Sequence, residues 1–151
     1  MLWPALLLLA APTQAQPVDI GVLQSVICSW ETRNLNESVK DSTPGPDGEI
    51  GRCQIKLATA EMAGCKVTAQ ELAIRRVNEY CAREILLFSF QRGHRRPATL
   101  AYAYNGGHYS RFGTKERAYR YARIQAVRYA EAIRRKQWRR MYSMTLAMRT
   151  R

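Results

Sequence analysis

The chain has few acidic residues, few histidines and no closely spaced pair of cysteines. Of its 151 residues, 12 are Asp or Glu and 24 are Lys or Arg, so the formal net charge is +12. This imbalance favours an anionic partner, such as nucleic acid, an acidic membrane surface or a negatively charged wall polymer. The four cysteines form no Cys-x-x-Cys pair and the histidines number two, which argues against a tetrahedral zinc site.

Long hydrophobic runs are also missing, except for one at the start of the chain. Residues 2–11, LWPALLLLAA, form an apolar run that is too short to span a bilayer. Two small residues, Thr13 and Ala15, follow it at positions that suit a cleavage site. We therefore interpret residues 1–15 as an export signal and expect no stable membrane span. A retained anchor or a misread start of the chain is the alternative.

The cysteines Cys28, Cys53, Cys65 and Cys81 bear on the same question. An exported chain reaches an oxidising compartment, where these four residues are expected to form disulfide bonds. Three complete pairings are possible, and the sequence does not choose among them. Four buried free thiols, as in a cytosolic protein, are the alternative.

A hydrophobic content of 46% excludes a disordered polyelectrolyte, and the length suits one domain with one core. Apolar residues recur at helical spacing over most of the chain. They predict helices at about 19–33, 57–63, 68–92, 97–103 and from 114 onward. Asp19 suits the N-cap of the first helix, and Thr68 with Glu71 forms a capping box that opens the third. We expect a mainly α, compact single domain.

Residues 34–51 are predicted to form a long polar loop rich in Asn, Ser, Asp, Gly and Pro. Loops of this length in compact domains are usually functional or disordered. The one candidate for β-structure is a short ribbon from Ile50 to Ile55. The residues alone leave both a functional and a disordered loop open.

The C-terminal residues 137–151 are expected to form a basic tail that follows a domain of residues 16–136. The basic residues from 134 onward, which no acidic residue accompanies, are Arg134, Arg135, Lys136, Arg139, Arg140, Arg149 and Arg151. One interpretation is a solvated helix end with a frayed terminus. The other is a patch that concentrates the protein on an anionic polymer or leaflet. The sequence contains no base-reading module, so we expect no nucleic-acid partner.

The first motif whose side chains could take part in a reaction is Ser29-Trp30-Glu31-Thr32, at the end of the first predicted helix. The Glu31 carboxylate lies at the negative end of the helix dipole, which disfavours its ionisation. Burial beside Trp30 raises its pKa further. A carboxyl group that stays protonated near neutral pH can act as a general acid. An ordinary surface glutamate is the alternative.

Two further motifs follow along the chain. The stretch Gly48-Glu-Ile-Gly51-Arg-Cys-Gln54 holds two glycines that permit a tight turn, and it carries Gln54 inward as an amide donor and acceptor. The stretch Ala103-Tyr104-Asn105-Gly-Gly places an aromatic residue and an amide before a glycine pair. A simple helix C-cap followed by a turn explains this last pattern equally well.

In this order and spacing the motifs resemble those of the soluble lytic transglycosylase (SLT) domain, a family related in fold to goose-type lysozyme. The family pattern is roughly Glu-Ser, a polar loop, Gly-x-x-Gly-Leu-Met-Gln-Ile-x-Pro-x-Thr-Ala, Ala-Tyr-Asn-Ala/Gly-Gly and a Tyr in the last helix. Glu31 matches the catalytic acid, with Thr32 in place of Ser. The other matching residues are Gly48, Gly51, Gln54, Ile55, Thr59, Ala60, Tyr104, Asn105 and Gly107. The resemblance covers about residues 19–133.

Several positions depart from the family pattern. Arg52 and Cys53 replace the usual Leu-Met, and Leu57 replaces Pro. Tyr121 is the best match to the tyrosine of the last helix, and Tyr119 is the alternative. These departures bear on substrate preference more than on the class of reaction.

The resemblance implies cleavage of the β-1,4 bond between N-acetylmuramic acid and N-acetylglucosamine in peptidoglycan. Glu31 acts first as acid and then as base, and 1,6-anhydromuramic acid ends result, as expected of a carbon–oxygen lyase. The substrate-binding residues implied by the same likeness are Thr32, Gln54, Tyr104, Asn105 and Tyr121. The family uses no metal and no organic cofactor, so none is expected here.

The same resemblance implies a lysozyme-like domain, with residues 34–51 as its active-site loop. Such a domain works on peptidoglycan glycan strands in the periplasm or at the cell-wall surface. A conjugation or secretion machine is a candidate partner, because assemblies of that kind have to pass through the wall.

Two other functions are compatible with the same residues. A hydrolytic muramidase of the goose-lysozyme type needs a second carboxylate to position water, and Asp41, Asp47 or Glu49 could serve. A non-catalytic peptidoglycan-binding factor would bind the wall without any turnover that depends on Glu31.

Overall fold

The computed structural model describes residues 17–106 and 114–149. These residues form six α-helices and one short 3₁₀ helix, and their β-structure is limited to one isolated bridge. The elements are α1 (Ile20–Glu31), η1 (Glu37–Val39), α2 (Leu57–Met62), α3 (Ala69–Leu72), α4 (Arg75–Gln91), α5 (Pro97–Tyr104) and α6 (Thr114–Arg149). The expected mainly α-helical single domain is confirmed. The predicted export signal, residues 1–15, and the matching Gly107 lie outside the described residues.

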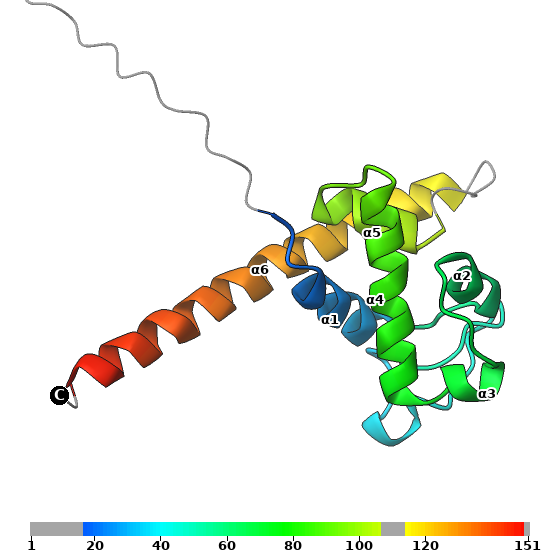
Figure 1. Cartoon of the computed structure of the whole chain (residues 1–151), viewed down its shortest axis with the longest axis horizontal. Helices are drawn as coiled ribbons and strands as arrows, with labels where there is room; N and C mark the ends of the chain where they lie inside the picture. The colour runs from blue at the N-terminus through cyan, green and yellow to red at the C-terminus, as the bar shows by residue number, and fades with distance from the viewer. Residues whose placement is uncertain (1–16, 107–113, 150–151) are drawn as a thin grey trace, which may run out of the picture.

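The longest helices, α4 and α6, define the shape of the molecule (Figure 1). α4 runs through the middle of the body and contacts α1, α2, α3 and α5. The N-terminal half of α6 packs against α5 and α1, whereas its C-terminal half projects away from the body. Within the described residues, no helix combines the length and the apolar character that a membrane crossing requires.

The first helix, α1, begins where the sequence predicts. The Asp19 side chain accepts a hydrogen bond of 3.1 Å from the backbone N–H of Val22, which satisfies one of the free N–H groups at the helix start. On the inner face of α1, Leu23 and Ile27 are fully buried. This face packs against α4 and α6, and the helix ends at Glu31.

Residues 68–92 differ from the prediction, because they form two helices rather than one. The predicted capping box opens α3 as expected, but the backbone is extended at Ile74 (φ −73°, ψ 122°) before α4 begins. The side-chain amide of Asn78 donates a hydrogen bond of 3.0 Å to the carbonyl of Leu72 and so caps the end of α3. Apolar spacing continues across this break, so the pattern alone does not reveal it.

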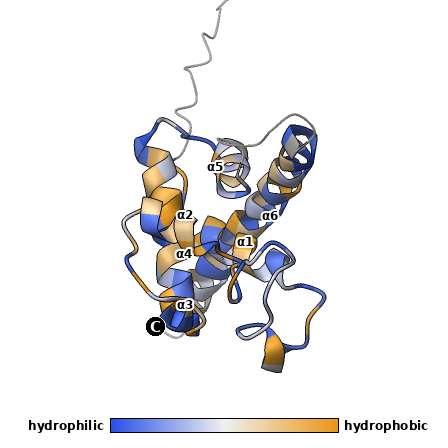
Figure 2. Ribbon diagram, turned by 90° about the vertical axis from the view of Figure 1, so that its right-hand side faces the viewer, coloured by the Kyte–Doolittle hydropathy of each residue, from blue (hydrophilic) through white to orange (hydrophobic). Residues whose placement is uncertain are grey.

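The core consists of two groups of buried residues. One group, from α1, α4 and α5, contains Leu23, Ile27, Leu86, Leu100 and Ala101. The other contains Cys28, Cys53, Ile55, Ala60, Cys65, Leu72, Cys81, Ala82 and Ile85. Tyr104, at the end of α5, packs against both groups. Figure 2 shows the apolar residues of α1 and α4 in the interior, where the two helices lie together.

Two disulfide bonds, Cys28–Cys53 and Cys65–Cys81, cross-link the second core group. The first joins α1 to the turn before α2, and the second joins the α2–α3 connection to α4. No cysteine is free, so the expected oxidation is confirmed, and the structure selects one of the three possible pairings. Two disulfides are consistent with an oxidising, extracytoplasmic location.

We predict that loss of the Cys28–Cys53 bond lowers the free energy of unfolding by about 3 kcal/mol, because it cross-links residues 25 positions apart. Urea unfolding of a Cys28→Ser/Cys53→Ser variant measures this effect. The matched control is Cys65→Ser/Cys81→Ser, which removes the bond between two residues that are 16 positions apart in the sequence.

A thiol titration of wild-type protein unfolded without reductant should detect no free thiol. Four free thiols would contradict both pairings.

Candidate active site

Glu31, the last residue of α1, lies against Tyr121 of α6. The Tyr121 hydroxyl donates a hydrogen bond of 2.5 Å to Glu31 Oε1, across 90 positions of sequence. Both residues are half-buried where α6 packs on α1. The structure therefore distinguishes the two tyrosines considered above. Tyr119 is exposed and stacks on Tyr102, with 4.7 Å between the ring centroids.

Burial is the main influence on the Glu31 carboxyl group. It raises the pKa of Glu31 above the ordinary value of 4.5, because the ionised form loses hydration. The hydrogen bond from Tyr121 and the positive charge of Arg33 lower this pKa in part, and the negative charge of Glu49 raises it. Glu31 therefore keeps its proton to a higher pH than a solvated glutamate does, which suits a general acid.

Two tyrosines place neutral hydroxyl groups near Glu31. Burial, followed by the negative charge of Glu31, raises the pKa of both Tyr104 and Tyr121 well above the ordinary value. Both hydroxyls therefore remain protonated at neutral pH and act as hydrogen-bond donors. Tyr121 donates to Glu31, whereas Tyr104 donates to the backbone carbonyl of Cys53 at 2.8 Å.

The turn from Ile50 to Ile55 is held from several directions. Its ends form one isolated antiparallel bridge, so the short β-ribbon considered for these residues is reduced to a single pair. Asn78 of α4 accepts a hydrogen bond of 2.8 Å from the backbone N–H of Cys53 and donates one of 2.9 Å to the Ile50 carbonyl. The disulfide to α1 and the hydroxyl of Tyr104 complete the anchorage of Cys53.

Asn78 is a residue whose role the sequence motifs do not predict. Its side chain is fully buried, and a buried amide requires hydrogen-bond partners such as those of the turn. Gly51 lies so close that a Cβ atom there would stand 2.5 Å from Asn78 Nδ2, and its φ of +72° also favours glycine. The available signal in the sequence is an amide side chain on the mostly apolar inner face of α4, where Ser89 is the other buried polar residue.

Arg52, which departs from the family pattern, ties the long loop to the same turn. Its guanidinium lies 2.6 Å from a Glu37 carboxylate oxygen and 3.0 Å from one of Asp41. Hydrogen bonds from Arg52 and then Lys40 lower the pKa of Glu37 to about 2. The neighbouring departure, Cys53, forms the disulfide to α1. Both unusual residues thus fasten the loop and the turn to the rest of the fold.

Gln54 lies beneath the folded loop. Its backbone has a positive φ of 49°, and its side-chain amide donates to the carbonyls of Thr43 at 3.2 Å and Gly51 at 2.8 Å. Gly45 passes so close to the side chains of Gln54 and Glu49 that any Cβ atom there would collide with both. The loop therefore closes over Gln54 and brings Glu49 beside it.

Thr32 and Asn105 differ in their exposure to solvent. Thr32 is buried, and its hydroxyl lies 3.5 Å from the Cys28 carbonyl and 3.4 Å from the Arg52 carbonyl. It thus links the end of α1 to the turn. Asn105 is exposed and is the C-cap residue of α5, so its amide is accessible to a ligand.

The three acidic residues considered for a second catalytic carboxylate differ in their surroundings. Asp41 is paired with Arg52, and Asp47 is exposed with Lys56 at 4.0 Å. Glu49 is 3.5 Å from Lys56, and its side chain is 18% exposed. Of the three, Glu49 is the one whose charge acts on the pKa of Glu31.

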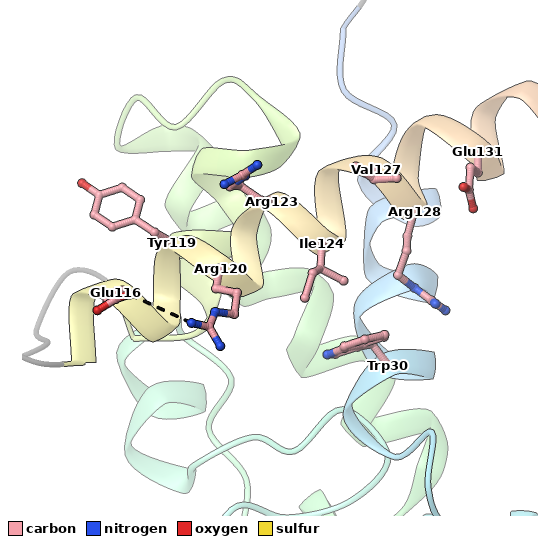
Figure 3. Close-up of a pocket in the computed structure, with 9 residues that line it drawn as sticks. All are labelled: Trp30, Glu116, Tyr119, Arg120, Arg123, Ile124, Val127, Arg128 and Glu131. Atoms are coloured by element: carbon pink, nitrogen blue, oxygen red, sulfur yellow. Dashed lines mark ion pairs between the residues drawn. The ribbon is translucent and has the colours of Figure 1, made fainter.

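A groove of about 720 Å³ runs along α6 beside Trp30, the residue that precedes Glu31 (Figure 3). Its lining consists of Trp30, Glu116, Tyr119, Arg120, Arg123, Ile124, Val127, Arg128 and Glu131. Two guanidinium groups lie over the indole ring, that of Arg33 at 3.7 Å and that of Arg128 at 5.0 Å from the centroid. Glu31 and Tyr121 do not line this groove, so it adjoins the candidate site rather than containing it.

Comparison of the chain with protein-family models, with curated proteins and with solved structures found no match. Across residues 17–106 and 114–149, no group of three or more His, Cys, Asp or Glu residues is placed to hold a metal ion. The candidate site is therefore defined by Glu31, its two tyrosines and the anchored turn.

The raised pKa of Glu31 predicts a pH dependence of stability. Below the ordinary value of 4.5, Glu31 is protonated in both the folded and the unfolded chain. As the pH rises above that value, the unfolded chain loses this proton first, so the free energy of unfolding falls until the folded-state pKa is passed. Urea unfolding at a series of pH values should show that Glu31→Gln removes this fall. The exposed Glu61→Gln controls for the lost charge. Parallel curves for wild type and Glu31→Gln would contradict the shift.

Proposed function

We propose that the chain is a peptidoglycan lytic transglycosylase with a lysozyme-like (SLT) domain. The observation that carries this proposal is the half-buried Glu31 carboxyl, whose pKa is raised and which accepts a hydrogen bond from Tyr121. One carboxyl group of this kind can serve first as acid and then as base. Tyr104 and Tyr121, which are far from Glu31 in sequence, also lie near enough for its charge to act on them, which supports the same proposal.

The reaction consists of two proton transfers. Protonated Glu31 gives its proton to the oxygen that bridges N-acetylmuramic acid and N-acetylglucosamine, and the bond from the muramic C1 to that oxygen breaks. The substrate's own acetamido group assists at C1. The Glu31 carboxylate then removes the proton from the muramic 6-hydroxyl, whose oxygen bonds to C1. Glu31 is again protonated, no water is consumed, and the product contains a 1,6-anhydro ring.

The other residues bind the glycan or hold the site in place. The Tyr121 hydrogen bond favours the ionised form of Glu31, so it stabilises the carboxylate between the two transfers. The accessible Asn105 offers its amide to the glycan, whereas the half-buried Gln54, whose side-chain N–H groups bind Thr43 and Gly51, offers its carbonyl oxygen. Tyr104 and Thr32 act through their bonds to the turn around Cys53.

We place this activity in the periplasm or at the cell-wall surface. The two disulfides and the signal-like residues 1–15 support an exported protein. The net charge of +12 suits an anionic wall. A conjugation or secretion machine that crosses the wall is a candidate partner.

Hydrolysis is the second candidate reaction, and Glu49 is the observation that favours it. Its carboxylate acts electrostatically on Glu31 and lies beside Gln54 under the loop. A second carboxylate that activates water would give a muramidase of the inverting or water-assisted kind. Asp41, held by Arg52, and the exposed Asp47 are less suited.

Glu31→Gln should lower the rate of glycan cleavage by at least about 10²–10⁴-fold, because one group performs both proton transfers. Turnover of purified sacculi measures this rate, and Glu61→Gln on α2 is the matched control. Glu49→Gln, Asp41→Asn and Asp47→Asn should each have a mild effect. Mass spectrometry should detect products that are lighter by one water than those of lysozyme, without new reducing ends.

Each contrary result identifies a different function. Ordinary reducing muramic acid ends, together with a Glu49→Gln effect as large as that of Glu31→Gln, would establish the hydrolase. Binding to sacculi without turnover would indicate a non-catalytic wall-binding factor. An unchanged rate in Glu31→Gln would remove the catalytic assignment.

A further inference from the structure

The C-terminal part of α6 projects from the body with large apolar side chains exposed. Every residue from Arg134 to Thr145 is exposed, and the helix continues well beyond α1 (Figure 1). Lys136 forms an ion pair of 2.7 Å with Asp19 at the start of α1. This ion pair lies where the helix leaves the body of the domain. The large apolar residues exposed here are Trp138, Met141, Tyr142 and Met144. Trp138 alone is 71% exposed.

Three of these apolar residues lie on one face of the helix, and Met144 lies beside that face. At 3.6 residues per turn, Trp138, Met141, Tyr142 and Thr145 stand at i, i+3, i+4 and i+7 and therefore share one face. We call residues 134–145 the α6 projection and this face its apolar stripe. Lys136 reaches toward the body from the other side of the helix, so the stripe is turned away from the domain.

Basic residues surround the stripe at its start. A shallow depression is lined by Glu131, Arg134, Arg135, Trp138 and Arg139, so three guanidinium groups border the indole of Trp138. Glu131 is 3.8 Å from Arg135, and no acidic residue follows Glu131 in the sequence. The α6 projection thus combines a strongly cationic border with an aromatic and apolar centre.

We propose that the α6 projection docks on the surface of a bilayer that contains anionic phospholipid. Trp and Tyr are the residues that favour the boundary between headgroups and acyl chains, and arginine binds phosphate through two N–H groups. A helix with an apolar stripe and a basic border lies in the plane of that boundary. The anionic headgroups complement the positive charge of the arginines, and the apolar stripe is buried at the boundary with the acyl chains.

Other binding partners would match only part of the surface of the α6 projection. An anionic wall polymer or a nucleic acid satisfies the arginines but leaves Trp138, Met141 and Tyr142 in water. A second copy of the chain can cover the stripe, but it brings two rows of arginines together without acidic partners. A bilayer with anionic lipid matches both features.

Docking has a consequence for the candidate site. Tyr121 and Trp138 lie on one continuous helix, separated by about 25 Å at 1.5 Å per residue. Because α1 is bound to α6 through both Glu31 and Asp19, the whole site follows the helix. The projection therefore fixes the position of Glu31 relative to the docked part of the helix. This inference does not depend on the reaction that Glu31 performs.

The test is co-sedimentation of the full chain with vesicles of phosphatidylcholine and phosphatidylglycerol, compared with vesicles of phosphatidylcholine alone. Residues 1–15 are the same in every variant, so differences between variants report on the projection. We expect Arg134→Gln/Arg135→Gln/Arg139→Gln to weaken binding to the anionic vesicles on the order of a hundredfold. The charge-matched control changes the exposed body residues Arg76, Arg83 and Arg92 to Gln and should change binding only a few-fold.

A second variant separates a bilayer from a polymer. Trp138→Ser/Met141→Ser/Tyr142→Ser keeps every charge, and we expect it to weaken vesicle binding at least about tenfold, since the stripe loses its buried area. On vesicle binding the emission of Trp138, identified with Trp138→Phe, should shift to shorter wavelength.

Three results would overturn the proposal. Unchanged vesicle binding by the Ser variant would mean that charge alone acts, as on a wall polymer or duplex DNA. Equal losses in the α6 and body arginine variants would mean that the projection is not the docking surface. A dimer in sedimentation velocity that only the Ser variant abolishes, without any preference for anionic vesicles, would make the stripe an interface between two copies.

Discussion

Cys53 is the residue on which the arrangement around Glu31 depends. Its sulfur is bonded to Cys28 on α1, its backbone N–H donates to Asn78 on α4, and its carbonyl accepts from Tyr104 on α5. Three helices therefore hold one residue by covalent and hydrogen bonds. Because Cys28 is one turn before Glu31, this anchorage sets the position of the turn relative to the carboxyl group.

The carboxyl group itself is poised by opposing influences. Burial disfavours its ionised form, whereas the hydroxyl of Tyr121 and the charge of Arg33 favour that form. Burial is the largest of these influences, so the pKa of Glu31 stays above its ordinary value. The packing of α6 on α1 supplies the hydrogen bond from Tyr121, and the same helix carries the exposed α6 projection beyond the domain.

Local chemistry made part of this structure predictable from sequence. The caps at Asp19 and Thr68 depend on residues three positions away, so they can be recognised without a fold. The contact between Glu31 and Tyr121 spans most of the chain, and helical spacing alone left Tyr119 as an alternative. The break between α3 and α4 was missed because a buried side chain, Asn78, caps it from the following helix.

The central claim is that burial raises the pKa of Glu31 while its carboxyl group accepts a hydrogen bond from Tyr121, and carbon-13 NMR of glutamate carboxyl groups tests it most directly. One titrating signal should be absent from Glu31→Gln. In the wild-type protein its pKa should lie above 4.5. In Tyr121→Phe it should rise further, because a hydrogen bond that favours the ionised form is lost. A Glu31 signal that titrates at or below the ordinary value, or that does not respond to Tyr121→Phe, would contradict the account.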